Sequence, residues 1–107
     1  MRKAIVFKYN VPVGILTEED NCYKFIYDDS YLLDNTKPSI SLTLPKTQKE
    51  YKSKFLFPAF SNLLSEGVNR KLQSRTLKID ENDSFGLLIA TANFDTVGAI
   101  TVKPINL

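Results

Sequence analysis

Hydrophobic and polar positions follow different periods in the two parts of the chain. In the first part, residues 4–9 and 13–17 are rich in β-branched and aromatic side chains, with Asn10-Val11-Pro12 between them. This pattern predicts a β-hairpin with a short connection. The next apolar run covers residues 22–27 and predicts a third strand with three aromatic side chains on one face, namely Tyr23, Phe25 and Tyr27.

A helical turn and a further strand are expected next. Residues 28–30 offer capping side chains ahead of residues 31–33, which predicts a single turn of helix. Residues 39–44 lie between two prolines and alternate strictly between apolar and hydroxyl side chains. That alternation predicts a strand whose packed face carries Ile40, Leu42 and Leu44. Residues 46–54 are polar and rich in lysine, which is typical of an exposed loop.

The apolar spacing becomes helical after residue 56. A first stripe consists of Phe57, Phe60, Leu63 and Leu64. Pro58 suits the first turn of that helix, and Gly67 is expected to end it. A second amphipathic helix is predicted from an apolar side with Val68, Leu72 and Ile79 and a polar side with Arg70, Lys71 and Arg75.

A third helix is expected after the acidic segment 80–83, which supplies capping groups and negative charge at a helix start. Its stripe consists of Phe85, Leu88, Ile89 and Ala92. Residues 97–102 return to strand composition and are expected to complete the sheet. Strands, then helices, then a strand predict one α+β domain over residues 1–107, with an antiparallel sheet and helices packed on it.

Composition narrows the possible functions. The chain has 14 basic and 12 acidic residues, a net charge of +2 that demands neither a nucleic-acid nor a membrane partner. The sequence has no histidine, which excludes Ser-His and Cys-His nucleophilic catalysis and the usual zinc sites. Its four glycines are scattered and form no phosphate-binding loop. No signal or membrane-spanning segment is evident, so we expect a cytoplasmic protein without a cofactor.

Several polar groups have both a structural and a functional interpretation. The acidic clusters 18–20, 28–29 and 80–83 could serve acid-base chemistry or hold a cation, but each lies at a predicted turn or helix start, where acids are common. Cys22 is more simply a packed residue than a reactive thiol. The basic residues of 70–78 could contact phosphates, or could form the solvated face of a helix.

The segment 62–68 differs in kind, because it joins two predicted helices and places Val68 after a Glu-Gly pair. An exposed apolar tip on a rigid frame suits insertion into a pocket of a partner. Val68 could equally be the first core residue of the following helix. The spacing of residues leaves both interpretations open.

Five motifs in series resemble the N-terminal region of HipA-type proteins. They are residues 13–17, 38–45, 57–67, 83–88 and 95–99, including the Phe-x-Asn-Leu-Leu core at 60–64. The resemblance covers essentially the whole chain and implies the first N-terminal subdomain, a small antiparallel, barrel-like unit with about three short helices. In HipA toxins this unit precedes a serine/threonine kinase core, and this chain ends at Leu107, so we expect no kinase residues in it.

A subdomain of this type by itself resembles HipS, the antitoxin of the three-part HipBST toxin-antitoxin systems. The resemblance implies a HipT-like kinase toxin as partner and a HipB-like helix-turn-helix protein, which contacts DNA, as a possible third component. It also implies that the loop after the Leu-Leu pair faces the kinase. The residues expected there are Asn62, Leu64, Ser65, Glu66, Gly67, Val68 and Arg70.

Two positions of that loop depart from the family pattern. A tryptophan often follows the Glu-Gly pair, and here the position is Val68, which buries much less surface. Ser65 stands where a proline is common. Besides a neutralising partner of the kinase, two other functions remain open at this point, namely a non-inhibitory subunit that completes a kinase and a small nucleic-acid-binding barrel.

Overall fold

The computed structural model describes residues 2–20, 22–61, 64, 67–91 and 100–105. Within these residues the chain forms five strands and four helices. In chain order they are β1 (Arg2–Lys8), β2 (Val11–Glu19), β3 (Cys22–Tyr27), α1 (Asp29–Leu33), β4 (Glu50–Ser53), α2 (Pro58–Ser61), α3 (Gly67–Leu77), α4 (Ser84–Thr91) and β5 (Ile100–Pro104).

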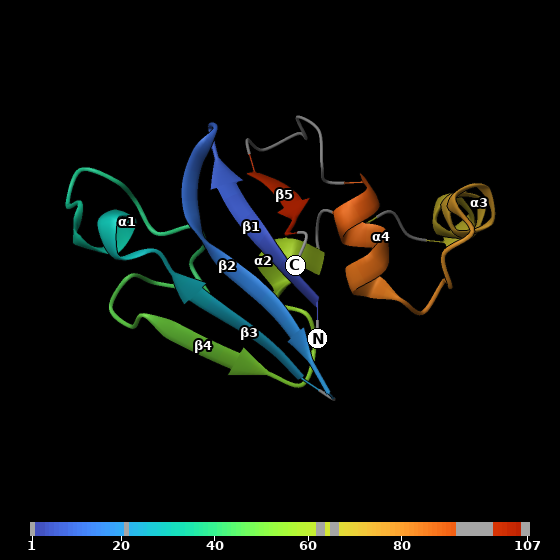
Figure 1. The fold of residues 1–107 in the computed structure, drawn as a ribbon, viewed down its shortest axis with the longest axis horizontal. Helices are drawn as coiled ribbons and strands as arrows, with labels where there is room; N and C mark the ends of the chain where they lie inside the picture. Colours follow the sequence, from blue (N-terminus) through green and yellow to red (C-terminus); the bar gives the residue numbers. More distant parts are fainter. Residues whose placement is uncertain (1, 21, 62–63, 65–66, 92–99, 106–107) are drawn as a thin grey trace.

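The strands form a single antiparallel sheet in the order β4-β3-β2-β1-β5 (Figure 1). Strands β1, β2 and β3 follow one another as a meander, and β5 pairs with the other side of β1. The helices lie behind and beside the sheet, with α1 and α3 at opposite ends of the molecule. The predicted α+β class with an antiparallel sheet is therefore confirmed.

The first hairpin turns at Tyr9 and Asn10, one residue earlier than the expected connection. Both residues have positive φ, 50° and 65°. Two successive positive φ values match the right-handed twist of the flanking strands, which is why such turns close hairpins. Val11 and Pro12 consequently belong to β2, and Pro12 pairs with Phe7 where the register shifts. Pro12 is tolerated at this irregular point of the ladder.

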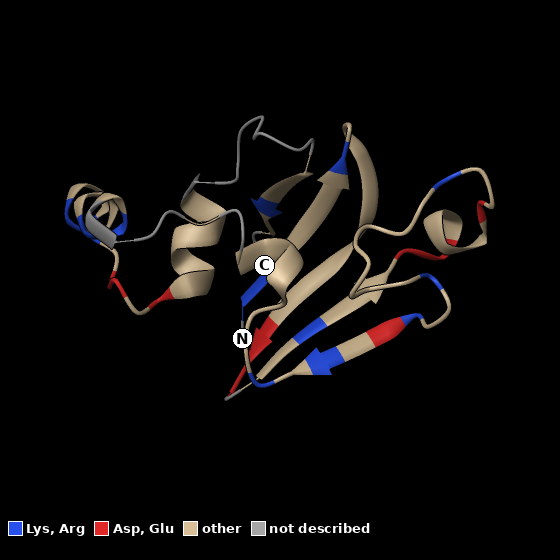
Figure 2. Cartoon of the chain, turned by 180° about the vertical axis from the view of Figure 1, so that it is seen from behind, with Lys and Arg blue, Asp and Glu red and all other residues tan. Residues whose placement is uncertain are grey.

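One face of the sheet carries the hydrophobic core. Figure 2 shows α2 lying over this face. Phe25 and Tyr27 are almost wholly buried, and Phe60 of α2 packs against Phe25 with ring centroids 5.6 Å apart. The predicted aromatic face of β3 is thus confirmed. The core also contains Ala4, Val6, Val13, Leu16, Tyr31, Phe57, Phe85, Leu88 and Val102.

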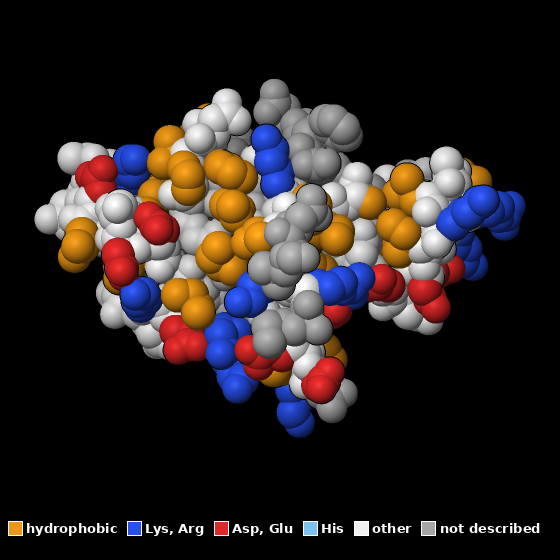
Figure 3. All heavy atoms as spheres, in the orientation of Figure 1, with side chains coloured by type: hydrophobic (Ala, Val, Ile, Leu, Met, Phe, Trp, Pro, Cys, Tyr) orange, Lys and Arg blue, Asp and Glu red, His pale blue; other side chains and the backbone are white. Residues whose placement is uncertain are grey.

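The opposite face of the sheet presents a cross-strand row of isoleucines. Ile15 of β2 is paired with Ile5 of β1 and with Ile26 of β3, and all three are half-buried. In the part of the chain that the structure describes, no helix lies over this face, and Figure 3 shows apolar side chains gathered across its centre.

The strand predicted for residues 39–44 is wrong. Ile40 and Leu44 are buried as expected, but Leu42 between them is 100% exposed. The hydroxyl of Tyr27 explains this arrangement, because it accepts a hydrogen bond from Ile40 N at 3.1 Å and donates one to Leu44 O. Both ends of the segment are drawn to one point, so the chain between them forms a turn, closed by Leu44 N donating to Ser41 O at 3.2 Å.

The loop expected at 46–54 is also partly wrong, because residues 50–53 form β4. This edge strand pairs with β3, and Tyr51 lies opposite Phe25. Charged side chains occupy its exposed positions, as is common on edge strands. The charged composition that suggested a loop therefore reflects the solvent-exposed side of the edge strand β4.

The helical region follows the prediction in part. Gly67 begins α3 rather than ending α2, and Leu72 of α3 is 52% exposed instead of buried. Helix α3 stops at Lys78, whose φ is 57°. Helix α4 agrees with its predicted stripe, since Phe85 and Leu88 are buried and Ile89 packs against the core. Ala92 and residues 97–99 lie outside the described residues.

Candidate partner-binding surface

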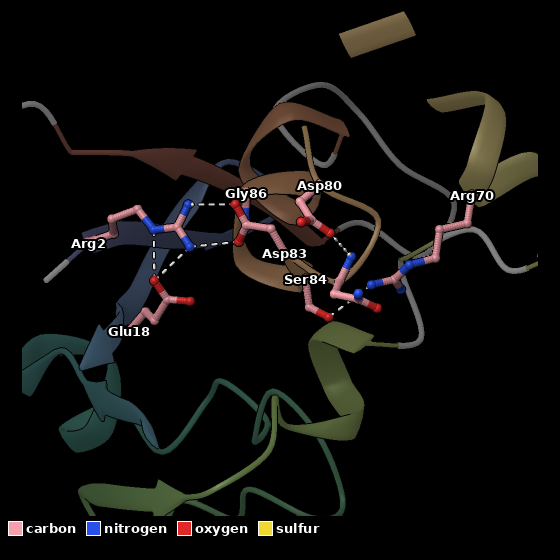
Figure 4. A network of polar contacts seen from close by, with 8 residues as sticks. Arg2, Glu18, Arg70, Asp80, Asp83, Ser84 and Gly86 are labelled. Carbon is pink, nitrogen blue, oxygen red and sulfur yellow. Dashed lines mark hydrogen bonds and ion pairs between the residues drawn. The ribbon is translucent and has the colours of Figure 1, made fainter. Parts of the chain in front are cut away.

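A polar cluster joins the start of α4 to the sheet (Figure 4). The guanidinium of Arg2 donates to both carboxylate oxygens of Asp83, at 3.0 and 2.6 Å. Its Nε also donates to Glu18 Oε1 at 2.7 Å. The planar fork of arginine suits two-point recognition of a carboxylate. Strands β1 and β2 and the residue preceding α4 are therefore held together at one point.

Asp83 has a second role as the cap of α4. Its Oδ1 accepts a hydrogen bond from the backbone of Gly86 at 3.0 Å, which satisfies one of the free N–H groups at the helix start. The Arg2 guanidinium lies 5.1 Å from the ring centroid of Phe85, the next residue but one. The carboxylate of Asp83 thus caps α4 and also holds the guanidinium of Arg2 in place.

These contacts change the protonation of the pair in opposite directions. Hydrogen bonding from Arg2 lowers the pKa of Asp83 below its ordinary value, although partial burial opposes the shift. The hydrogen bond to Asp83 likewise raises the pKa of Arg2 above its ordinary value. Both groups are charged at neutral pH, so the cluster is a structural ion pair rather than an acid-base couple.

Arg70 connects α3 to the same region. Its Nε donates to the backbone oxygen of Glu81 at 2.9 Å, and its NH2 group donates to Ser84 Oγ at 3.0 Å. Arg70 was predicted to face a partner, and the structure uses its guanidinium to fix α3 against the beginning of α4. This positioning role is not evident from the sequence, because it depends on how α3 lies against the segment that leads into α4.

The other predicted loop residues are placed only in part. Leu64 is half-buried and packs against the core. Gly67 and Val68 are the first two residues of α3. Asn62, Ser65 and Glu66 lie outside the described residues. Further along α3, two leucines are exposed among polar and cationic side chains, namely Leu72 at 52% and Leu77 at 41%.

An open cavity of about 400 Å³ lies at the other end of the molecule, between the β1–β2 turn and α1. Its lining combines apolar and cationic side chains, namely Lys8, Tyr9, Val11, Tyr31, Lys37 and Pro38. The Lys37 ammonium lies 5.7 Å from the ring centroid of Tyr31 and 3.9 Å from an oxygen of Asp34. The charge of Lys37 is therefore partly compensated within the chain.

The acidic clusters take structural roles where they are described. Glu19 and Glu50 both pair with Lys24, each at 3.3 Å, and the hydrogen bond from Lys24 lowers the pKa of Glu19. Among the described residues, no group of three or more cysteine or acidic side chains could hold a metal ion. Cys22 is half-buried and its Sγ lies 3.8 Å from Glu19 Oε2.

No helix in the described part of the chain has the length and apolar character needed to cross a membrane.

Comparison with known proteins assigns the fold to a family. The family model of the HipA N-terminal domain matches residues 4–103. The chain therefore belongs to the HipA N-terminal domain family, as the motif series predicted. The solved structure of an "N-terminal domain of HipA toxin" superimposes with a TM-score of 0.70 over 99% of this chain and 94% of that one, at 23% identity. At that identity the superposition supports the fold alone.

Two curated relatives differ in length. An uncharacterized protein of Haemophilus influenzae is 29% identical over 103 residues, which cover 96% of this chain and 92% of the relative. The protein named "Putative kinase Y4dM" of Sinorhizobium fredii is 33% identical over 103 residues, which cover 90% of this chain but 25% of that protein. The domain thus occurs both as most of a small protein and as a quarter of a larger one.

Proposed function

We propose that this chain is a binding subunit that associates with a HipA-type serine/threonine kinase and neutralises it, in the manner of an antitoxin. The observation that carries the proposal is the family match over residues 4–103, taken together with a relative named as a kinase in which the matching segment is a quarter of the protein. A domain used in this way has a surface that meets the rest of the kinase. The same surface on a separate chain can bind a kinase core.

The start of α3 is the surface we assign to this contact. The helix is fixed at one side by Arg70, whose guanidinium is occupied by Glu81 and Ser84. Its exposed side carries Leu72 and Leu77. A preformed helix with exposed apolar residues loses little entropy on binding, which favours association. We propose that Gly67 and Val68, at the first turn of this helix, contact the kinase together with the preceding loop.

A second candidate function has support of its own. In the Sinorhizobium relative the domain is part of the protein named as a kinase, which favours a role in completing the kinase fold without inhibiting it. A nucleic-acid-binding role has less support, because Arg70, one of its three basic residues, is bonded within the chain. Any contact with DNA would then come through a helix-turn-helix protein of the HipB type in a joint complex.

A kinase assay separates these functions. The chain is co-expressed with a HipA-type kinase of the same genome, and the two are co-purified through a tag on the kinase. Phosphorylation by the purified kinase is then measured with and without added chain. Neutralisation predicts co-purification, lower phosphorylation and rescued growth. Co-purification with unchanged or raised phosphorylation would support the structural role, and failure to co-purify would contradict both.

A further inference from the structure

The cavity between the β1–β2 turn and α1 adjoins a second hollow, of about 280 Å³, at the end of the molecule that carries α1 (Figure 1). The two hollows share Val11, Tyr31 and Lys37, and together they form one elongated site, here named the turn groove. The first hollow, of about 400 Å³, is lined further by Lys8, Tyr9 and Pro38, and the second by Pro12, Asp28, Ser30 and Asp34.

The two hollows of the turn groove carry opposite charges. Lys8 and Lys37 line the first hollow without a carboxylate, whereas Asp28 and Asp34 line the second. Lys37 Nζ lies 3.9 Å from Asp34 Oδ2 where the hollows meet. Lys8 forms no ion pair with an acidic side chain in the described part of the chain. Asp28 precedes α1, but its side chain makes no capping hydrogen bond. One cation and one carboxylate are therefore available to a ligand.

The wall of the turn groove formed by residues 34–38 is held in place by hydrogen bonds. The hydroxyl of Tyr31 donates to Pro38 O at 2.7 Å. Lys46 Nζ donates to Asp34 O at 2.7 Å and to Lys37 O at 2.9 Å, so the ends of this segment are fixed. A site that is already ordered loses little conformational entropy when it binds a ligand.

Tyr9 at the mouth of the first hollow has a conformation that its side chain does not favour. Its φ is 50°, a value that glycine, asparagine and aspartate adopt readily in such turns and that is uncommon for a bulky residue. The side chain is 75% exposed, so packing within the chain does not offset this cost. The fold therefore gives no reason for an aromatic residue here, whereas a ligand in the first hollow does.

We propose that the turn groove binds an extended peptide segment of a partner protein, in which an apolar residue lies between an acidic and a basic one. The acidic side chain pairs with Lys8, the apolar side chain contacts Tyr9 and Val11, and the basic side chain pairs with Asp28. Opposite charges on both sides of apolar walls match a polypeptide, whose charge changes from residue to residue. This inference is independent of the proposed contact with a kinase, because α1 and α3 lie at opposite ends of the molecule.

The test uses two capped peptides that carry the charges in either order, Gly-Glu-Leu-Lys-Gly and Gly-Lys-Leu-Glu-Gly, titrated into the isotope-labelled chain and followed by nuclear magnetic resonance. At least one should shift the backbone signals of Lys8, Tyr9 and Lys37 and leave those of α3 unchanged. The uncharged peptide Gly-Gln-Leu-Gln-Gly should bind at least about 10-fold more weakly, because it lacks the charge-assisted bonds.

Three variants of the chain sharpen the test. Lys8→Glu should weaken binding of the better peptide by about 10-fold and favour Gly-Lys-Leu-Lys-Gly instead. Lys52→Glu is the matched control, since Lys52 is an exposed lysine of β4 outside both hollows, and it should bind as the wild type does. Tyr9→Asn should weaken binding and yet raise the melting temperature, because asparagine tolerates positive φ.

Several outcomes would overturn the peptide groove. They are no shifts with either charged peptide, equal binding of the uncharged one, and equal losses for Lys8→Glu and Lys52→Glu. Signals that change with protein concentration alone would identify a second copy of the chain as the occupant and would also overturn it. If circular dichroism shows that Lys8→Glu unfolds, Tyr9→Asn decides, and undiminished peptide binding by that variant contradicts the proposal. None of these results bears on co-purification with a kinase.

Discussion

Arg2 and Asp83 form a two-point ion pair across 81 residues of chain. Arg2 is the first residue of β1, and Asp83 precedes α4, so the pair connects the sheet to the helix that closes the core. The side chains are 41% and 29% exposed, which makes this a partly buried pair. Together with the buried side chains of Phe85 and Leu88, it holds the start of α4 against the sheet.

We expect Asp83→Asn to lower the free energy of unfolding by about 1–2 kcal/mol, because it removes a charge-assisted pair while preserving the shape of the side chain. Asp29→Asn is the matched control. Asp29 pairs with Lys49 at 2.5 Å, but its side chain is 74% exposed, and pairs in that setting contribute little. Urea unfolding measures both. Equal losses for the two variants would show that the geometry of the Arg2 pair adds nothing.

The same pair predicts how stability depends on pH. Arg2 lowers the pKa of Asp83, so the folded state favours the ionised carboxylate more than the unfolded chain does. The resulting stabilisation is complete above the unfolded value near 4 and is lost as the pH falls through the lower folded pKa. The raised pKa of Arg2 adds no pH dependence in this range. Unfolding between pH 2 and 6 should therefore show a steeper acid loss for the wild type than for Asp83→Asn.

Tyr27→Phe should cost about 1–3 kcal/mol, because it leaves the buried groups Ile40 N and Leu44 O without their partner. Burial raises the pKa of Tyr27, so the hydroxyl remains a donor over the neutral range. Tyr31→Phe is the control, since its hydroxyl makes one part-buried bond, to Pro38 O at 2.7 Å. A smaller loss for Tyr27→Phe than for Tyr31→Phe would contradict the role assigned to Tyr27.

Gly14→Ala should destabilise the sheet by about 1–3 kcal/mol through overpacking. A Cβ at Gly14 would overlap the carbonyl oxygen of Ile26 and lie 3.0 Å from the ring of Phe25. Gly86→Ala provides the comparison, because there a Cβ would displace the Asp83 carboxylate from Arg2, and the helix propensity gained, about 1 kcal/mol, offsets much of that loss. Thermal melts should show a large loss for the first variant and little net change for the second.

Val68→Asp should abolish inhibition of the kinase while leaving the fold intact, because a charge at the start of α3 opposes insertion into an apolar pocket. Asn69→Asp, an exposed neighbour in the same helix, adds the same charge and should inhibit normally. Circular dichroism and the phosphorylation assay check the two properties separately. If Val68→Asp unfolds, Val68 belongs to the core and the assigned contact is wrong.

Local patterns were sufficient for elements whose structure depends on near neighbours. Strand 22–27 and the stripe of α4 were predicted because alternation and helical spacing directly report which face is buried. The motif series predicted the family, which the match over residues 4–103 confirms. In the predicted contact loop, Leu64 packs against the core and Arg70 bonds to Glu81 and Ser84. The partner-binding role of this loop remains a proposal.

The errors have a common physical cause. Residues 39–44 alternate as a strand does, yet the hydroxyl of Tyr27 draws Ile40 and Leu44 together and turns Leu42 outward. Residues 50–53 have the composition of a loop, yet β3 offers them a free edge. In each case a partner distant in sequence competes with the local preference and prevails.

By itself, the sequence determined the class of fold, the family and the absence of histidine-based chemistry, because periodicity, motifs and composition are properties of the chain alone. The tertiary structure decided where the free surfaces lie. The Arg2–Asp83 pair, the use of Arg70 within the molecule and the exposure of Leu42 all arise from hydrogen bonds between distant residues. Such bonds depend on how the elements pack, which no local pattern encodes.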